Sequence, residues 1–155
     1  MFTDLSKTNM KTAVIYSRTS SSGYQVNRQD TTRQVADLKA YAKYAQLEVV
    51  KVYEEHVSGA SKQKPTLVEA IDYCKREHVD TLLVSELSRV GRNALEVLAT
   101  VKELVDNKIN LFMQKEQLTL LDEKGEPTLF APIMIATLST CAQLERDSIS
   151  FRLNS

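Results

Sequence analysis

Five polar residues that together could act on a phosphate ester follow apolar runs of the chain. Ser20 lies two positions after Arg18, and because side chains alternate along an extended segment, both point to the same side. Arg89 and Arg92 are three residues apart and share a face if their turn is helical. Lys64 lies in a loop after another apolar run. A hydroxyl can serve as a nucleophile, and guanidinium forks bind phosphate oxygens and stabilise charge on a phosphorus under attack.

Each of these residues also has a purely structural interpretation. A serine at a strand end is usually a turn former or helix cap, and Ser21 and Ser22 compete with Ser20 for the role of nucleophile. Arginines three residues apart usually form a solvated face. His56 and His78 are isolated, without the carboxylate or cysteine spacing of a metal site, and no Ser-His-Asp set can be assembled.

The elements that must position these residues alternate between strands and helices. The apolar patterns predict strands at 13–16, 48–53, 81–84 and 109–113, and helices at 30–46, about 66–78 and 94–107. Alternation of this kind predicts an α/β fold with a mainly parallel sheet of four to five strands flanked by helices. Ligands of such sheets bind beyond the carboxyl ends of the strands, where we expect the polar residues to converge.

A long helix is predicted at the C-terminal end, over residues 127–155. The stretch Pro127–Leu144 carries no charged side chain, and its apolar residues spread around most of a helix circumference. Polar residues dilute the run and no basic flank precedes it, which argues against a membrane span. We expect one side of the helix to bury on its own sheet and the other on a second protomer. If the face of Ile133, Met134 and Leu138 is the outer one, a charged residue at any of these positions should weaken association. The alternative is a helix enclosed within one monomer.

Composition limits the classes of protein that the chain can represent. Its 155 residues are 43% hydrophobic with 4 Gly and 3 Pro, which predicts one compact domain. Lys plus Arg and Asp plus Glu number 20 each, so any polyanion must be met by a local cluster of cations. Cys74 and Cys141 fall in apolar helical patterns, so we expect two reduced core thiols. With no signal-peptide pattern, the expected compartment is the cytoplasm.

Several segments, taken in order, resemble the catalytic domain of serine recombinases, the family of resolvases and DNA invertases. They are Val-Ile-Tyr-Ser-Arg18-Thr-Ser20, Arg33-Gln34-Val-Ala-Asp-Leu, Val57-Ser58-Gly59 with Lys64-Pro65, Glu86-Leu-Ser-Arg89-Val-Gly-Arg92, and Ala142-Gln-Leu-Glu145-Arg146. The resemblance implies an N-terminal extension at 1–10, a resolvase-like catalytic domain at 11–126 and an oligomerisation helix at 127–155. The DNA-binding domain that the family normally carries after this helix is expected to be absent from this chain.

The resemblance also implies a reaction and its participants. Ser20 would attack a DNA phosphodiester to leave a 5′-phosphoserine link and a free 3′-OH, while Arg18, Arg89 and Arg92 hold the phosphate and Gln34 is a further active-site residue. Bond energy kept in the ester lets the strands rejoin without ATP, so no metal or nucleotide cofactor is implied. The expected partners are a double-stranded DNA recombination site and further copies of the chain, as a homodimer and as a tetramer on paired sites. No membrane partner is expected.

Three residues depart from the family pattern. Lys64 stands where the family usually has arginine, which keeps the charge but loses the bidentate fork. Ser88 and Glu55 stand where the family often has aspartate.

Two other functions fit the same residues. A phosphate-processing α/β enzyme would use the same strand ends, although the four scattered glycines form no phosphate cradle. A catalytically inactive dimerisation module would keep the long helix and dispense with Ser20 and the arginines. The distance from the Ser20 hydroxyl to the three guanidinium groups would distinguish these classes.

Overall fold

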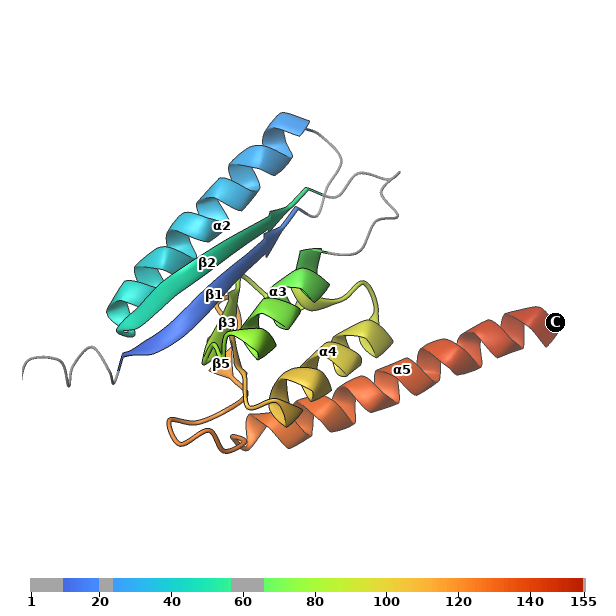
Figure 1. Ribbon diagram of the computed structural model, residues 1–155. Coiled ribbons are helices and arrows are strands. Elements are labelled where there is room, and N and C mark those ends of the chain that lie inside the picture. Colours follow the sequence, from blue (N-terminus) through green and yellow to red (C-terminus); the bar gives the residue numbers. More distant parts are fainter. Residues whose placement is uncertain (1–9, 20–23, 57–65, 155) are drawn as a thin grey trace, which may run out of the picture.

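A five-stranded sheet with helices on both faces forms the body of the molecule (Figure 1). The computed structural model describes residues 10–19, 24–56 and 66–154, with side chains described from residue 31 in the first helix and up to residue 148 in the last. The strands are β1 (Lys11–Arg18), β2 (Leu47–Glu55), β3 (Thr81–Val84), β4 (Asn110–Met113) and β5 (Leu118–Thr119). The helices are α2 (Tyr24–Tyr44), α3 (Thr66–Arg76), the 3-10 turn η1 (Leu87–Val90), α4 (Ala94–Asp106) and α5 (Phe130–Asn154). The predicted α/β fold is confirmed.

The order of the strands creates a topological switch point between β1 and β3. The order is β2-β1-β3-β4-β5, with the first four strands parallel and β5 antiparallel to β4. Helix α2 covers one face, and α3 and α4 lie on the other (Figure 1). The chain moves from β1 to one side and then returns to place β3 on the other side. In parallel sheets, such a switch point opens a binding crevice at the carboxyl ends of the two strands.

The interior strand β1 carries core residues on both faces. Ala13 and Ile15 pack in the cluster under α2, whereas Val14 and Tyr16 pack in the larger cluster on the side of α3 and α4. All four side chains are buried. This two-sided burial explains why the strand is an unbroken apolar run in the sequence, and it fixes the position of Arg18 at its end.

Helix α5 packs against α4 and extends beyond it (Figure 1). The Thr128 hydroxyl, just before the helix, donates to the Thr119 carbonyl at 3.0 Å. Pro132 lies in the first turn, where its missing N–H costs nothing. Within the uncharged stretch, Thr137 and Thr140 donate their hydroxyls to carbonyls one turn earlier, so their polarity is satisfied by the helix itself.

The burial of α5 corrects the expectation for its faces. Met134 is 4% exposed and packs in the core of its own chain, with Leu138 partly buried against the same cluster. Met134 therefore does not lie on the outer face, and the expectation that it contacts a second protomer is wrong. Ile133 and Leu144 are each 61% exposed, which also excludes a helix enclosed within one monomer.

Other differences from the sequence-based expectations are local. Cys74 is buried, but Cys141 is exposed on α5, so the expectation of two core thiols is wrong for Cys141. Helix α2 begins at Tyr24, earlier than the predicted start at residue 30. The sequence did not predict these first turns, because they lack the apolar spacing that marks a buried helix face. The two-residue strand β5 was too short to predict. Residues 1–9 of the expected N-terminal extension lie outside the described residues. None of the described helices is long and apolar enough to cross a bilayer.

Candidate active site

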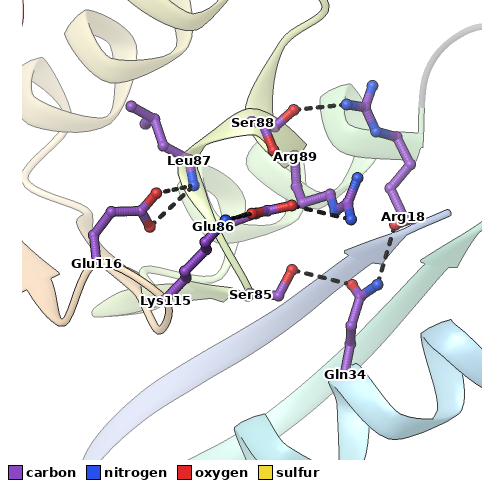
Figure 2. Close-up of polar contacts among 9 residues, drawn as sticks. All are labelled: Arg18, Gln34, Ser85, Glu86, Leu87, Ser88, Arg89, Lys115 and Glu116. Atoms are coloured by element: carbon purple, nitrogen blue, oxygen red, sulfur yellow. Dashed lines mark hydrogen bonds and ion pairs between the residues drawn. The ribbon is translucent and has the colours of Figure 1, made fainter. Parts of the chain in front are cut away.

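Arg18 reaches the loop that carries Arg89 across the switch point of the sheet. Arg18 ends β1, and its Nη2 donates to the Ser88 carbonyl oxygen at 2.7 Å (Figure 2). Arg89 follows Ser88 in η1, the turn after β3. The charges of both arginines act on the buried Tyr16 hydroxyl. The structure thus brings two of the predicted phosphate ligands to one place.

Gln34 joins the ends of the two strands that flank the switch point. Its side chain projects from α2 and is 7% exposed. The Nε2 group donates to the Arg18 carbonyl at 3.3 Å, and Oε1 accepts from the Ser85 hydroxyl at 3.2 Å (Figure 2). Because Arg18 ends β1 and Ser85 follows β3, this amide ties the two carboxyl ends together. The predicted site residue Gln34 lies within the cluster.

The guanidinium groups retain buried donors that have no partner among the described residues. The Nε atoms of Arg18 and Arg89 are buried, and neither has a hydrogen-bond partner among the residues that the structure describes. The Arg89 side chain is 12% exposed and pairs through Nη2 with Glu86 at 3.0 Å. Buried donors left unpaired cost free energy, and an anionic oxygen can satisfy a guanidinium edge.

Glu86 bridges Arg89 to a second cation, Lys115, on the turn after β4. The distance from Lys115 Nζ to Glu86 Oε2 is 3.3 Å (Figure 2). Burial raises the pKa of Glu86, but hydrogen bonds from Lys115 and Ser88 and the charges of Arg89 and Lys115 outweigh burial and lower it. The carboxylate is therefore ionised at neutral pH. Sequence reasoning missed both residues, since only the three-residue spacing of Glu86 and Arg89 hinted at a pair.

Arg92 is held apart from this cluster. The 3-10 turn ends at Val90, so the helical turn that would place Arg89 and Arg92 on one face does not form. The Arg92 side chain is exposed and makes no hydrogen bond or ion pair with any described residue, while its backbone N–H donates to Glu96 Oε1 at 2.9 Å. A Cβ on Gly91 would lie 2.6 Å from the Val97 backbone nitrogen, so only glycine allows this close passage.

Two predicted site residues, Ser20 and Lys64, lie outside the described residues, as do Ser21 and Ser22. The structure therefore gives no distance from the Ser20 hydroxyl to the arginines. The chain just before Ser20 is anchored, because the Thr19 N–H donates to the Glu55 carbonyl at 3.1 Å.

The Glu55 side chain is held by a buried tyrosine. It accepts from the Tyr16 hydroxyl at 2.7 Å. Burial, followed by this hydrogen bond and the Glu55 charge, raises the pKa of Tyr16 well above its ordinary range, whereas the charges of Arg18 and Arg89 act in the opposite sense. Glu55 therefore fixes the carboxyl ends of β1 and β2.

An open cavity of about 650 Å³ lies at the opposite edge of the sheet. It is lined by residues at or near the amino ends of four strands, including Lys11, Leu47, Thr81 and Asn110. The arginine cluster lies at the carboxyl ends, so the cavity and the cluster are separate features. Among the described residues, no group of three or more His, Cys, Asp or Glu could hold a metal ion.

Comparison with known proteins identifies the family. The family model described as "Resolvase, N terminal domain" matches residues 13–155. The chain belongs to the resolvase family. This resolvase-family chain is 30% identical over 108 residues to the transposon Tn2501 resolvase of Escherichia coli, covering 68% of this chain and 52% of the relative. It is 28% identical over 99 residues to the transposon Tn552 DNA-invertase BinR of Staphylococcus aureus, covering 64% and 48%. The chain therefore spans about half the length of the curated relatives it matches.

Solved structures agree with this assignment. A resolvase family site-specific recombinase from Streptococcus pneumoniae superimposes with a TM-score of 0.73 and 27% identity, covering 92% of this chain and 93% of that one. The N-terminal catalytic domain of TP901-1 integrase gives a TM-score of 0.66 and 25% identity, covering 88% and 98%. The resolvase-family chain thus has the fold of a site-specific recombinase catalytic domain.

Proposed function

We propose that this chain cleaves and rejoins DNA at recombination sites, with Ser20 as the nucleophile. Residues 11–126 are the catalytic domain in this proposal, and 127–155 are the oligomerisation helix. The observation that carries it is the pairing of Arg18 with the Arg89 loop at the switch point, with two buried Nε donors unpartnered among the described residues. Family membership and the recombinase fold support the same reaction.

The scissile phosphate binds to a set of cations drawn from three loops. Arg18 and Arg89 hold its oxygens by their guanidinium edges, the exposed Arg92 adds a third guanidinium, and Lys64 adds an ammonium group. Gln34 keeps the ends of β1 and β3 in register beneath the phosphate. Support comes from the contacts of Gln34 with the Arg18 carbonyl and the Ser85 hydroxyl.

The reaction conserves phosphodiester bonds. The Ser20 oxygen attacks the phosphorus, a phosphoserine ester forms at the 5′ end, and the bond to the 3′ oxygen breaks. The serine loses a proton and the leaving 3′ oxygen gains one. The arginines stabilise the extra negative charge that develops on phosphorus. Attack by a 3′-OH on the ester reverses these steps and needs no ATP, metal or redox partner.

Self-association is proposed to occur through the outer face of α5. Ile133, Thr137, Thr140 and Leu144 recur at helical spacing and are all exposed. They form an uncharged stripe on the side of α5 opposite its buried residues, and burying such a stripe favours association. We propose a homodimer through this face and a tetramer on paired DNA sites. We also propose that the reaction takes place in the cytoplasm, because the proposed partner is DNA.

Covalent trapping on DNA tests the proposal. A pool of duplexes carrying nicks releases a short fragment after cleavage, so the covalent protein–DNA complex accumulates and is seen on a denaturing gel. We expect no complex from Ser20→Ala. Loss of one donor to the developing charge costs about 2 to 4 kcal/mol, so Arg89→Ala should be roughly 30- to 900-fold slower. Lys102→Ala, which removes an exposed cation from α4, is the matched control and should match the parent.

The results separate the competing functions. A parent-level complex from Ser20→Ala would refute the assignment of the nucleophile. A parent that dimerises and forms no complex on any DNA would instead favour the inactive dimerisation module.

A further inference from the structure

We propose that Glu86 is a positioning residue for Arg89, and that Lys115 prevents Glu86 from weakening the hold of Arg89 on the DNA phosphate. The inference rests on the proposed function, because it concerns an arginine that would bind the scissile phosphate. Neither Glu86 nor Lys115 belongs to the set of cations and hydroxyls that contact DNA in that proposal. Both would act through Arg89.

The Glu86 carboxylate uses one oxygen for each cation. Oε1 lies 3.0 Å from Arg89 Nη2, and Oε2 lies 3.3 Å from Lys115 Nζ. The side chains of Arg89 and Glu86 are only 12% and 21% exposed, so their pairing is partly shielded from solvent. A side chain held on one edge presents the rest of its donors in a fixed direction. Glu86 thereby orients the guanidinium.

The turn between β4 and β5 holds Lys115 against the arginine loop, the segment 85–90 after β3 that carries Arg89. The Lys115 N–H donates to the Ser85 carbonyl at 2.8 Å. The next residue, Glu116, accepts from the Leu87 N–H at 3.3 and 3.4 Å, at the start of η1 (Figure 2). The turn thus contacts Ser85, Glu86 and Leu87 in succession. This fixed backbone places the Lys115 ammonium beside Glu86, although most of the Lys115 side chain is exposed.

A carboxylate beside a phosphate ligand needs a counter-charge. Glu86 is ionised, and its negative charge alone would cancel that of Arg89 and repel an incoming phosphate. With Lys115 present, two cations and one anion leave one net positive charge for the phosphate. Without Lys115 the remaining pair is neutral. The arrangement therefore orients Arg89 without removing its net attraction for DNA.

Charge-specific variants test this arrangement at saturating DNA in the covalent trapping assay. We expect Glu86→Ala to cleave about 10-fold more slowly, because the guanidinium loses its anchor. Lys115→Met should cleave about 2- to 5-fold more slowly, the size expected for a partly exposed pair. The double variant Glu86→Gln with Lys115→Met should recover the parent rate, because one net positive charge is restored. Lys115→Arg should also match the parent. The Lys75–Glu103 pair, also at 3.3 Å, supplies the control variants Lys75→Met and Glu103→Ala.

A readout that does not require DNA cleavage separates this inference from the proposed function. In the ¹⁵N-labelled 155-residue chain, the Arg89 Nε–Hε NMR signal should be sharp, broaden in Glu86→Ala and stay sharp in Glu103→Ala. If the parent cleaves DNA while Glu86→Ala cleaves equally fast, or the double variant stays as slow as Lys115→Met, the inference is overturned and the proposed function stands. If the parent never cleaves DNA but the NMR pattern holds, the proposed function fails and the positioning of Arg89 is supported. Should Glu86→Ala not fold, the charge variants of Lys115 carry the test.

Discussion

Two adjacent residues on α5 should respond oppositely to the same substitution. Met134 is 4% exposed in the core, whereas Ile133 is 61% exposed on the outer face. Truncating a buried methionine costs about 2 to 5 kcal/mol, so Met134→Ala should lower the free energy of unfolding by that amount. At roughly 2 to 4 °C per kcal/mol, the melting temperature should fall by about 4 to 20 °C. Ile133→Ala should leave the free energy of unfolding within about 0.5 kcal/mol of the parent.

Self-association should show the reverse order. Burying the exposed part of Ile133 in a symmetric dimer is worth about 1 kcal/mol for each copy, so Ile133→Ala should weaken dimerisation roughly 30-fold. Sedimentation velocity over a concentration series measures this change, and urea unfolding at a concentration where the parent is monomeric measures stability. The reasoning is refuted if Ile133→Ala dimerises like the parent, or if Met134→Ala is as stable as the parent.

Four further predictions concern the site and the core. Lys64→Arg should cleave DNA at least as fast as the parent, because a planar fork replaces a point charge; equal cleavage by Lys64→Ala would remove the position from the site. Gly91→Ala should fold but cleave DNA at least about 10-fold more slowly, because its Cβ would lie 2.6 Å from the Val97 backbone nitrogen and would displace the arginine loop. Cleavage by Gly91→Ala at the rate of the parent would contradict this prediction. Burial raises the pKa of Cys74 to about 12, so a thiol reagent at pH 8 should label Cys141 alone in the folded chain. Because the pKa of Cys74 is raised in the folded chain, its neutral thiol should contribute fully to the free energy of unfolding below about pH 8.5, and this contribution should be lost as pH rises towards 12. If the difference between the urea midpoints of the parent and Cys74→Ala stays constant across that range, this prediction is contradicted.

The fold could be predicted where local patterns agree with tertiary packing. β3 and the first residue of α4 match the prediction to the residue, because an apolar run defines the former and Asn93 caps the latter. The start of α2 could not be predicted, since its first turns show no apolar stripe. For α5, an uncharged sequence gives no information on which face the chain covers. The buried face is decided by how α5 packs against α4, and the sequence of α5 alone carries no information on that contact.

The arginine cluster was predictable only in part. The proximity of Arg18 to the Arg89 loop follows from the rule that carboxyl ends of parallel strands meet at one edge. The roles of Glu86 and Lys115 do not follow from it, because they depend on how the turn after β4 lies against the loop after β3. For Arg92 the sequence pattern was misleading. The three-residue spacing predicted that Arg89 and Arg92 lie on one helical face, but the helical turn η1 ends at Val90, before Arg92.

The central claim is that Ser20 carries the DNA phosphate during the reaction. The most direct measurement is to trap the covalent complex on nicked DNA, digest the protein and the DNA, and locate the phosphorylated residue by tandem mass spectrometry. The account predicts phosphate on Ser20 in the parent and no phosphopeptide from Ser20→Ala. Phosphate on Ser21 or Ser22, or on any residue of Ser20→Ala, would contradict it.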